Sequence, residues 1–299
     1  MSRLRFLFLF IVLLFVAGFS AADETSAKQK KVAIEGLKKA DIPKGNVAES
    51  ETVILAGVLP ETRLKSIGDA LTKTSKTARK ALQFDEKDEP WKGKLTVVLL
   101  PERTHFSSYM RLVVGQRVEG NYHINIRSDE PTVVSGAELD AKATDSDVLG
   151  ELGPVLAGAW IQAKVGPSAN IPSWVRLGLG RAIAYRAEGP SSKRFSGYKT
   201  RARAAVLGGG GKPAAPIMDI WNSDRAEGLD LATSLMDYMA FGTGQANFGK
   251  FLAALRPDEN GDAPAIAKSI EDAGWKTPAD LEVAWKKWVT AGAIAKSSP

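Results

Sequence analysis

The stretch DVLGELGPVLAGAWIQAKVGPSANIPSWVRLGLGRAIAYR spans residues 147–186. Along both of its halves, bulky apolar residues recur at steps of three and four, a spacing that places them on one face of a helix. They are Val148, Leu152, Val155, Leu156, Ala159 and Trp160 in the first half, and Trp174, Leu177, Leu179 and Ile183 in the second. A short segment rich in glycine and proline separates the halves. The spacing therefore predicts two helices, joined by a short loop, that belong to the core of the fold.

Pro154 lies inside the first of these helices, close to Gly150 and Gly153. Proline inside a helix removes one backbone donor and costs about 3 kcal/mol unless the helix kinks. Each glycine lowers the helix propensity by a further ~1 kcal/mol relative to alanine. We therefore predict a bend or a restart of the helix between Gly150 and Pro154.

The same stretch resembles the centre of a gluzincin-type zinc metallopeptidase of the peptidase MA-like family. In that family one helix carries the motif HExxH, and a second helix, opening with Pro-x-Trp, supplies the third zinc ligand as a Glu before a Gly. Two histidines four residues apart share one helix face, and the glutamate between them is the general base. Here residues 150–154 (GELGP) fall on HExxH, and residues 172–180 (PSWVRLGLG) fall on the second pattern.

The side chains at the ligand positions of that pattern do not bind zinc. Gly150 and Pro154 stand where the two histidines belong, and Leu177 stands where the glutamate belongs. Catalytic zinc is typically held by three protein side chains that donate lone pairs. The side chains of Gly150, Pro154 and Leu177 have no lone pair to donate. Only Glu151, at the position of the general base, is kept. The resemblance therefore implies a degenerate member of the family, with zinc lost and with no metal-binding or catalytic residue.

A displaced catalytic site is the alternative. A hydrolase or peptidase of this kind would combine Asp145, Asp147 and Glu151 with one of the only two histidines, His105 and His123. Both histidines lie in other expected elements, so they would have to converge with the carboxylates in space. An unrelated α+β protein with an accidental resemblance to the family is a third interpretation.

The first 22 residues have the pattern of a secretory signal peptide. Arg3 and Arg5 open the segment, residues 4–16 are largely apolar, and the small residues 20–22 (SAA) end it. The apolar run is shorter than the ~20 residues that a bilayer span needs, which disfavours an uncleaved anchor. We therefore expect cleavage near Ala22 and a mature chain without a membrane span. It would be secreted, or located in the periplasm or elsewhere in the cell envelope.

Composition narrows the class of partner. The 299 residues include no cysteine, so disulfides, thiolate metal sites and cysteine nucleophiles are excluded. The formal charge is +6, and loss of Arg3 and Arg5 with the signal peptide leaves +4. This mild basic excess suits an anionic envelope surface, but the basic residues form no stripe or module typical of nucleic-acid-binding proteins. We therefore expect an extended peptide or an envelope polymer as the partner, and no nucleic acid.

The rest of the chain divides into regions of different composition. Residues 23–50 are polar, and we expect a flexible arm there. Residues 51–140 follow the order strand, helix, strand, helix, strand, strand, which favours an α+β lobe with a small mixed sheet. The helix pair occupies residues 141–190. Residues 217–299 have helical apolar spacing, and residues 281–285 (LEVAW) resemble the Leu-Glu-x-x-Trp helix that ends the family's helical tail.

Residues 191–216 are rich in glycine, proline and basic residues. They include RFSGYKTRAR at residues 194–203 and LGGGGKP at residues 207–213. The glycine run before Lys212 lacks the GxxxxGK[ST] spacing of a phosphate-binding loop. We therefore expect a mobile surface loop.

A candidate binding segment precedes the helix pair. Thr132, Val133, Val134 and Ser135 form a strand-like run that resembles the edge strand on which gluzincins pair an extended peptide. Such pairing uses main-chain hydrogen bonds, so it could outlast the loss of catalysis. An edge strand covered by a neighbouring loop is the alternative. The sequence thus predicts an exported, catalytically inactive gluzincin-like protein, a pseudopeptidase, with a binding, structural or regulatory role.

Overall fold

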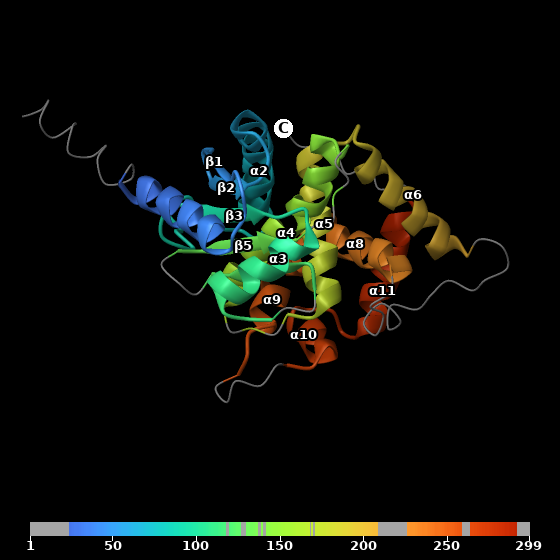
Figure 1. Ribbon diagram of the computed structural model, residues 1–299. Coiled ribbons are helices and arrows are strands. Elements are labelled where there is room, and N and C mark those ends of the chain that lie inside the picture. Colours follow the sequence, from blue (N-terminus) through green and yellow to red (C-terminus); the bar gives the residue numbers. More distant parts are fainter. Residues whose placement is uncertain are drawn as a thin grey trace, which may run out of the picture.

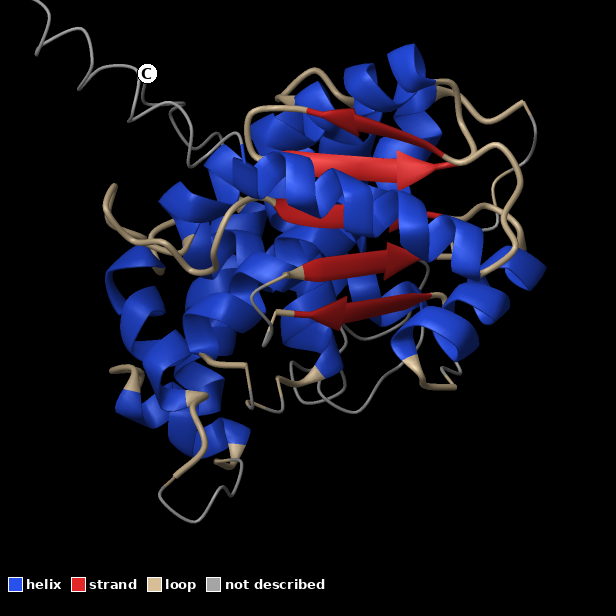
Figure 2. Ribbon diagram, turned by 60° about the vertical axis from the view of Figure 1, so that its left-hand side comes forward, coloured by secondary structure: helices blue, strands red, loops and turns tan. Residues whose placement is uncertain are grey.

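Five strands form one mixed sheet in the order β1-β2-β3-β5-β4 (Figure 2). The computed structural model describes residues 24–117, 120–126, 130–136, 139, 142–167, 169, 171–208, 226–258 and 264–291. The expected signal peptide, residues 1–22, lies outside these residues. No helix among the described residues is long and apolar enough to cross a bilayer.

The three central strands are parallel, and the two outer strands run antiparallel to their neighbours. Every residue of β2 and β3 is buried. Such continuous apolar runs are typical of parallel strands that helices cover on both faces. The strands are β1 (Asn46–Glu49), β2 (Val53–Gly57), β3 (Leu95–Leu99), β4 (Tyr122–Asn125) and β5 (Thr132–Ser135).

Helices cover both faces of the sheet. The helix over residues 24–39, blue in Figure 1, packs with α3 on one face, where Leu37 and Phe106 join Val98 in one cluster. On the other face, α2 and α4 bury Leu64 and Leu156 in the large core. These helices are α2 (Glu61–Ala81), α3 (Arg103–Tyr109) with the π-helical segment η1 (Met110–Val114), and α4 (Asp145–Val165). The expected α+β class and the order strand, helix, strand, helix, strand, strand are confirmed.

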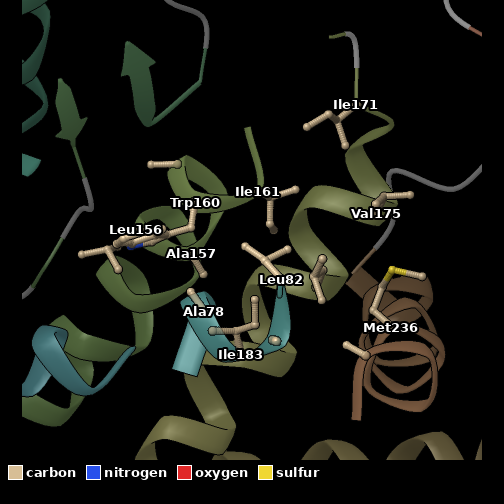
Figure 3. Close-up of a cluster of buried hydrophobic side chains, with 14 of the residues drawn as sticks. Ala78, Leu82, Leu156, Ala157, Trp160, Ile161, Ile171, Val175, Ile183 and Met236 are labelled. Carbon is tan, nitrogen blue, oxygen red and sulfur yellow. The ribbon is translucent and has the colours of Figure 1, made fainter. Parts of the chain in front are cut away.

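The remaining helices extend the molecule beyond this lobe (Figure 1). Within the described residues, the C-terminal part is helical, as expected. The helices are α5 (Ser173–Glu188), α6 (Lys193–Leu207), α8 (Ala226–Phe241), α9 (Gln245–Ala254), α10 (Ile266–Asp272) and α11 (Pro278–Thr290). Figure 3 shows Ala78 of α2, Leu82 just after it, Ala157 of α4 and Ile183 of α5 in one cluster of buried side chains, to which Met236 of α8 also belongs.

Two segments expected to lack regular structure are helical. Residues 24–39, placed in a flexible arm, bury Ala33 and Leu37 four residues apart on the sheet. In α6, placed in a loop, Tyr198, Ala202 and Val206 are buried at steps of four. Both predictions are wrong because a narrow apolar face suffices when a ready core covers it, however polar the rest of the helix is. The glycine-rich part at residues 209–216 lies outside the described residues.

Glu49 on β1 ties the first helix to the sheet edge. Its carboxylate accepts hydrogen bonds from Ser26 at 2.7 Å and Lys94 at 2.8 Å, and lies 2.6 Å from the Lys30 ammonium. Partial burial by itself raises the pKa of Glu49, but the hydrogen bonds from Lys30, Lys94 and Ser26 outweigh it and lower this pKa to about 2. The charged form is therefore stabilised by folding.

We predict that Glu49→Gln reduces the pH dependence of stability. The folded pKa lies below the unfolded value near 4.5, so the Glu49 charge stabilises the fold above about pH 4.5, and this contribution is lost toward about pH 2. With allowance for solvent screening, the variant should lose on the order of 1–2 kcal/mol of unfolding free energy at pH 7 and less at pH 3. Urea titrations at both pH values measure this. Glu51→Gln, which removes an exposed ion pair with Lys76, is the control; equal losses at the two pH values for Glu49→Gln would contradict the prediction.

Candidate functional site

Helix α4 runs unbroken through Pro154. Of the bend or restart predicted between Gly150 and Pro154, the restart is therefore wrong, and the bend stays a prediction. The helix buries Val148, Leu152 and Leu156 on both sides of the proline. Each such side chain contributes about 1.5–3 kcal/mol on burial, which together exceeds the ~3 kcal/mol that an interior proline costs.

Carboxylates at the start of α4 have structural partners. Thr144 and Asp147 form a capping box, in which the Thr144 amide donates to the Asp147 carboxylate at 2.9 Å. Asp145 accepts from the Arg63 guanidinium at 2.7 Å. Two of the acidic residues named for a displaced catalytic site, Asp145 and Asp147, thus stabilise the start of the helix. Glu151, at the position of the general base, is exposed.

Small residues bring α4 and α5 into close antiparallel contact. A methyl group added at Gly153 would lie 3.0 Å from the Ala184 side chain, and one added at Gly180 would lie 2.6 Å from the Pro154 carbonyl oxygen. Gly158 comes next along α4, and its added methyl group would lie 3.7 Å from the Arg176 side chain. The partners therefore run backward along α5 as α4 runs forward.

This register separates the three ligand-equivalent positions. Gly150 lies one turn before Gly153, so it faces the part of α5 at or beyond Ala184, whereas Leu177 lies near the residues that face Gly158. Seven residues of helix, from Leu177 to Ala184, span about 10 Å. Zinc ligands must all lie about 2 Å from one point. Gly150, Pro154 and Leu177 therefore do not surround a common position.

The residues of α4 near Leu177 in this register supply no ligand either. Ala157, Gly158 and Ile161 are all buried in the helix contact. Their side chains have no lone pair. This face of α4 would therefore supply no zinc ligand even if these residues, in place of residues 150–154, were aligned with HExxH.

A guanidinium group occupies the space beside Gly150. A methyl group added at Gly150 would lie 2.6 Å from Nη2 of Arg194. Arg194 is held there by the Ser146 carbonyl oxygen at 2.5 Å and by the Glu188 carboxylate at 3.1 Å. Any longer side chain at Gly150 would meet this cation, and a metal ion beside it would be repelled.

The two histidines lie on the opposite face of the sheet from α4. His105 is on α3, with Nδ1 3.5 Å from the Glu102 carboxylate but without a hydrogen bond to it. His123 of β4 pairs with Val134 of β5, whose side chain belongs to the cluster under α3. Burial lowers the pKa of His123. Neither histidine shares a site with Glu151, so the grouping required by the displaced-site alternative does not form among these residues.

The candidate peptide-binding strand lies inside the sheet. Residues Thr132–Ser135 form β5, where Val133 pairs with Val97 of β3 on one side and Ile124 of β4 on the other. The expectation that this run is an edge strand is wrong, because both of its backbone edges are already paired. The edge next to α4 is β4 instead.

A buried charge network, which the sequence analysis missed, joins α5, α6 and α8. Asp237 of α8 is fully buried and accepts hydrogen bonds from Arg186 and, at 2.7 Å, from Tyr198. The Lys199 ammonium lies 3.9 Å away. Burial, and then the Asp237 charge, raise the pKa of the Tyr198 phenol, which therefore stays protonated and donates. A lone Asp in the apolar run LATSLMDYMAF was the signal, since a buried carboxylate needs partners.

A similar arrangement near the start of α8 joins Asp230 to two arginines. Asp230 accepts from Arg201 of α6 at 2.5 Å and from Arg181 of α5 at 3.4 Å. The hydrogen bond from Arg201 to Asp230 raises the pKa of Arg201. Asp230 and Asp237 thus fasten α5 and α6 to α8, and the buried part of the network has a structural role.

We predict that Asp237→Asn strongly destabilises the fold. The variant keeps the side-chain shape but leaves Arg186 without its buried counter-charge, which costs about 3–5 kcal/mol. Urea unfolding at pH 7 measures the loss. Asp272→Asn, which removes an exposed ion pair with Lys268, should cost no more than about 0.5 kcal/mol. Similar small losses in both variants would contradict the structural role of Asp237.

We also predict opposite effects for two glycine substitutions. In Gly180→Ala the added methyl group meets the backbone of Pro154, and overpacking of about 1–3 kcal/mol outweighs the ~1 kcal/mol gain in helix propensity. In Gly197→Ala of α6 the nearest atom, at 3.1 Å, is the flexible end of Arg201, so the variant should gain up to about 1 kcal/mol. Thermal unfolding measures both. A stabilised Gly180→Ala would show that α4 and α5 are not in tight contact.

Neither a protein-family model nor a curated protein sequence matches this chain.

Proposed function

We propose that the protein is an exported, catalytically inactive gluzincin-like protein, a pseudopeptidase, that acts by binding and not by chemistry. The order of the elements in the N-terminal lobe agrees with what the resemblance implies for that lobe. The pairing of α4 and α5 agrees with the two central helices that the resemblance implies, but their register does not bring the three ligand positions together.

The observation that carries the proposal is the use of the α4–α5 contact for packing. The backbone of Pro154 lies against Gly180, and the guanidinium of Arg194 fills the space beside Gly150. In an HExxH enzyme this space would hold imidazole groups and a metal-bound water. Here Pro154 packs against α5 and Arg194 of α6 fills the space beside Gly150, so what the fold offers a partner is its surface.

An extended peptide is the partner that this proposal favours, with β4 as the strand that receives it. β4 is the last strand of the sheet and packs beside α4, where Ile124 lies 3.3 Å from a methyl group added at Gly158. Tyr122 of the same strand lies under the Arg176 guanidinium, 5.6 Å from it. A peptide added here would bind through main-chain hydrogen bonds and needs no catalytic group.

The metal content of the purified chain, residues 23–299, tests the loss of catalysis. We expect no stoichiometric zinc after incubation with zinc and desalting, and no hydrolysis of casein with or without added zinc. Glu151→Gln is the matched variant: in a zinc peptidase it would abolish activity, whereas here we expect zinc content, hydrolysis and stability to match the unsubstituted chain.

One zinc ion per chain, removable by a chelator, would overturn the proposal. In that case His105→Ala and His123→Ala would identify the ligands. Casein hydrolysis that Glu151→Gln abolishes would overturn it equally.

A further inference from the structure

A pocket of about 420 Å³ opens at the end of the sheet where β2 and β3 begin. Its volume lies within the range of about 300–1,000 Å³ in which pockets hold small organic ligands. The indole rings of Trp91 and Trp160 form an apolar part of its lining, and most of the other lining side chains are polar. An apolar wall with a few polar groups beside it fixes both the position and the orientation of a ligand.

The two indole rings make one apolar surface. Their centroids lie 4.4 Å apart, with an angle of 54° between the ring planes. The Trp160 indole N–H donates to the Ser75 hydroxyl at 3.3 Å in the core, and the Arg79 guanidinium lies 5.5 Å from the centre of the Trp160 ring. Trp91 is only partly buried, and its indole N–H has no hydrogen-bond partner in the part of the chain that the structure describes. Trp91 therefore keeps ring surface and one donor for a ligand.

The segment that carries Trp91 is held in place by hydrogen bonds. The Arg79 guanidinium donates to the carbonyl oxygens of Asp85 at 2.7 Å and Asp88 at 3.0 Å. The Asp85 amide also donates to the Asp88 carboxylate at 2.9 Å. Gly93, with φ 71°, then turns the chain toward β3 in a left-handed conformation that favours glycine. A segment fixed in this way loses little conformational entropy when a ligand binds.

The pocket is also anchored to the two most buried strands. Thr52 directly precedes β2, Lys94 directly precedes β3, and both line the pocket. The Leu95 amide donates to the Thr52 carbonyl oxygen at 3.3 Å, which joins the two sides. Binding groups that are supported by rigid strands are positioned more precisely than groups on a free loop.

The charges that line the pocket nearly cancel. Glu51 and Lys94 both form ion pairs with residues outside the lining. That leaves the carboxylates of Asp88 and Glu89 and the guanidinium of Arg79. The carboxylates would repel an anion. Arg79 would repel a cation, and it already lies over one of the two aromatic rings. The lining therefore suits an uncharged ligand with hydrogen-bonding groups.

We propose that this pocket binds a saccharide, with a pyranose ring stacked on Trp91 and its hydroxyl groups donating to Glu89. A pyranose ring has a face of C–H groups, which packs on an indole, and a rim of hydroxyl groups, which donate well to carboxylates. Glu89 is exposed and forms no ion pair or hydrogen bond with the described residues. The Trp91 N–H supplies a donor for a further hydroxyl oxygen. The inference does not depend on the proposed loss of catalysis.

Calorimetric titration of residues 23–299 with cellobiose, maltose and N,N′-diacetylchitobiose tests the proposal. These uncharged disaccharides differ in linkage and in substituent. We expect at least one of them to bind at a single site, with an affinity that does not change with the sodium chloride concentration. Trp91→Ala should weaken this binding about tenfold or more, and Glu89→Gln about threefold or more, because one removes the stacking surface and the other the charged acceptor.

Two matched variants serve as controls. Trp288→Ala removes a partly buried indole of α11, and Glu271→Gln removes an exposed carboxylate of α10. Both should bind the disaccharide like the unsubstituted chain. Circular dichroism and thermal unfolding check that the variants fold. Glu89→Gln changes an exposed side chain without a partner, so it keeps the test decisive even if Trp91→Ala unfolds.

Choline separates a saccharide from a cationic ligand. If choline binds and all three disaccharides do not, the rings form a cation site and the proposal is overturned. It is overturned equally if none of the disaccharides binds, or if binding is unchanged in both Trp91→Ala and Glu89→Gln. A loss of binding in Trp288→Ala or Glu271→Gln as large as in the pocket variants would also contradict it.

Discussion

The close approach of α5 to its two neighbours is the constraint on which the rest of the structure depends. On one side Gly180 lies against the backbone of Pro154 in α4. On the other, a methyl group added at Gly178 would lie 2.7 Å from the Ala232 carbonyl oxygen of α8. A helix with side chains at both positions would stand farther from both partners. The glycines thus let α5 act as the central element between the sheet lobe and the C-terminal helices, and Arg186 and Arg181 then reach the carboxylates of α8.

For the proposed pseudopeptidase, this arrangement gives a physical reason for the loss of a zinc site. A zinc site needs space between two helices for imidazole rings, a metal and water, whereas contact between small residues removes that space. The cation of Arg194 beside Gly150 opposes a metal by charge as well as by volume. Restoring histidines at Gly150 and Pro154 would therefore have to be accompanied by a shift of α5 and the removal of Arg194.

The parts of the fold that the sequence predicts correctly are those whose pattern is set locally. The runs VILAG and LTVVL indicate buried strands, and the apolar spacing of residues 147–186 indicates the helix pair, because burial on wide faces leaves a strong pattern. The helix at residues 24–39 and α6 were missed because lysines and arginines outnumber their few buried apolar residues. The identity of Gly150, Pro154 and Leu177 is evident in the sequence, but their separation along the helix pair depends on the register between α4 and α5.

The strand order has a consequence for how the sheet is assembled. β4 precedes β5 in the chain, yet among the described strands β4 pairs only with β5, which in turn pairs with β3. β4 therefore meets the rest of the sheet through β5, whether these two strands pair before or after β5 joins β3. As the outermost strand, β4 can also detach while leaving the other pairings intact. β4, and any binding surface that it forms, is therefore ordered only while it stays paired with β5.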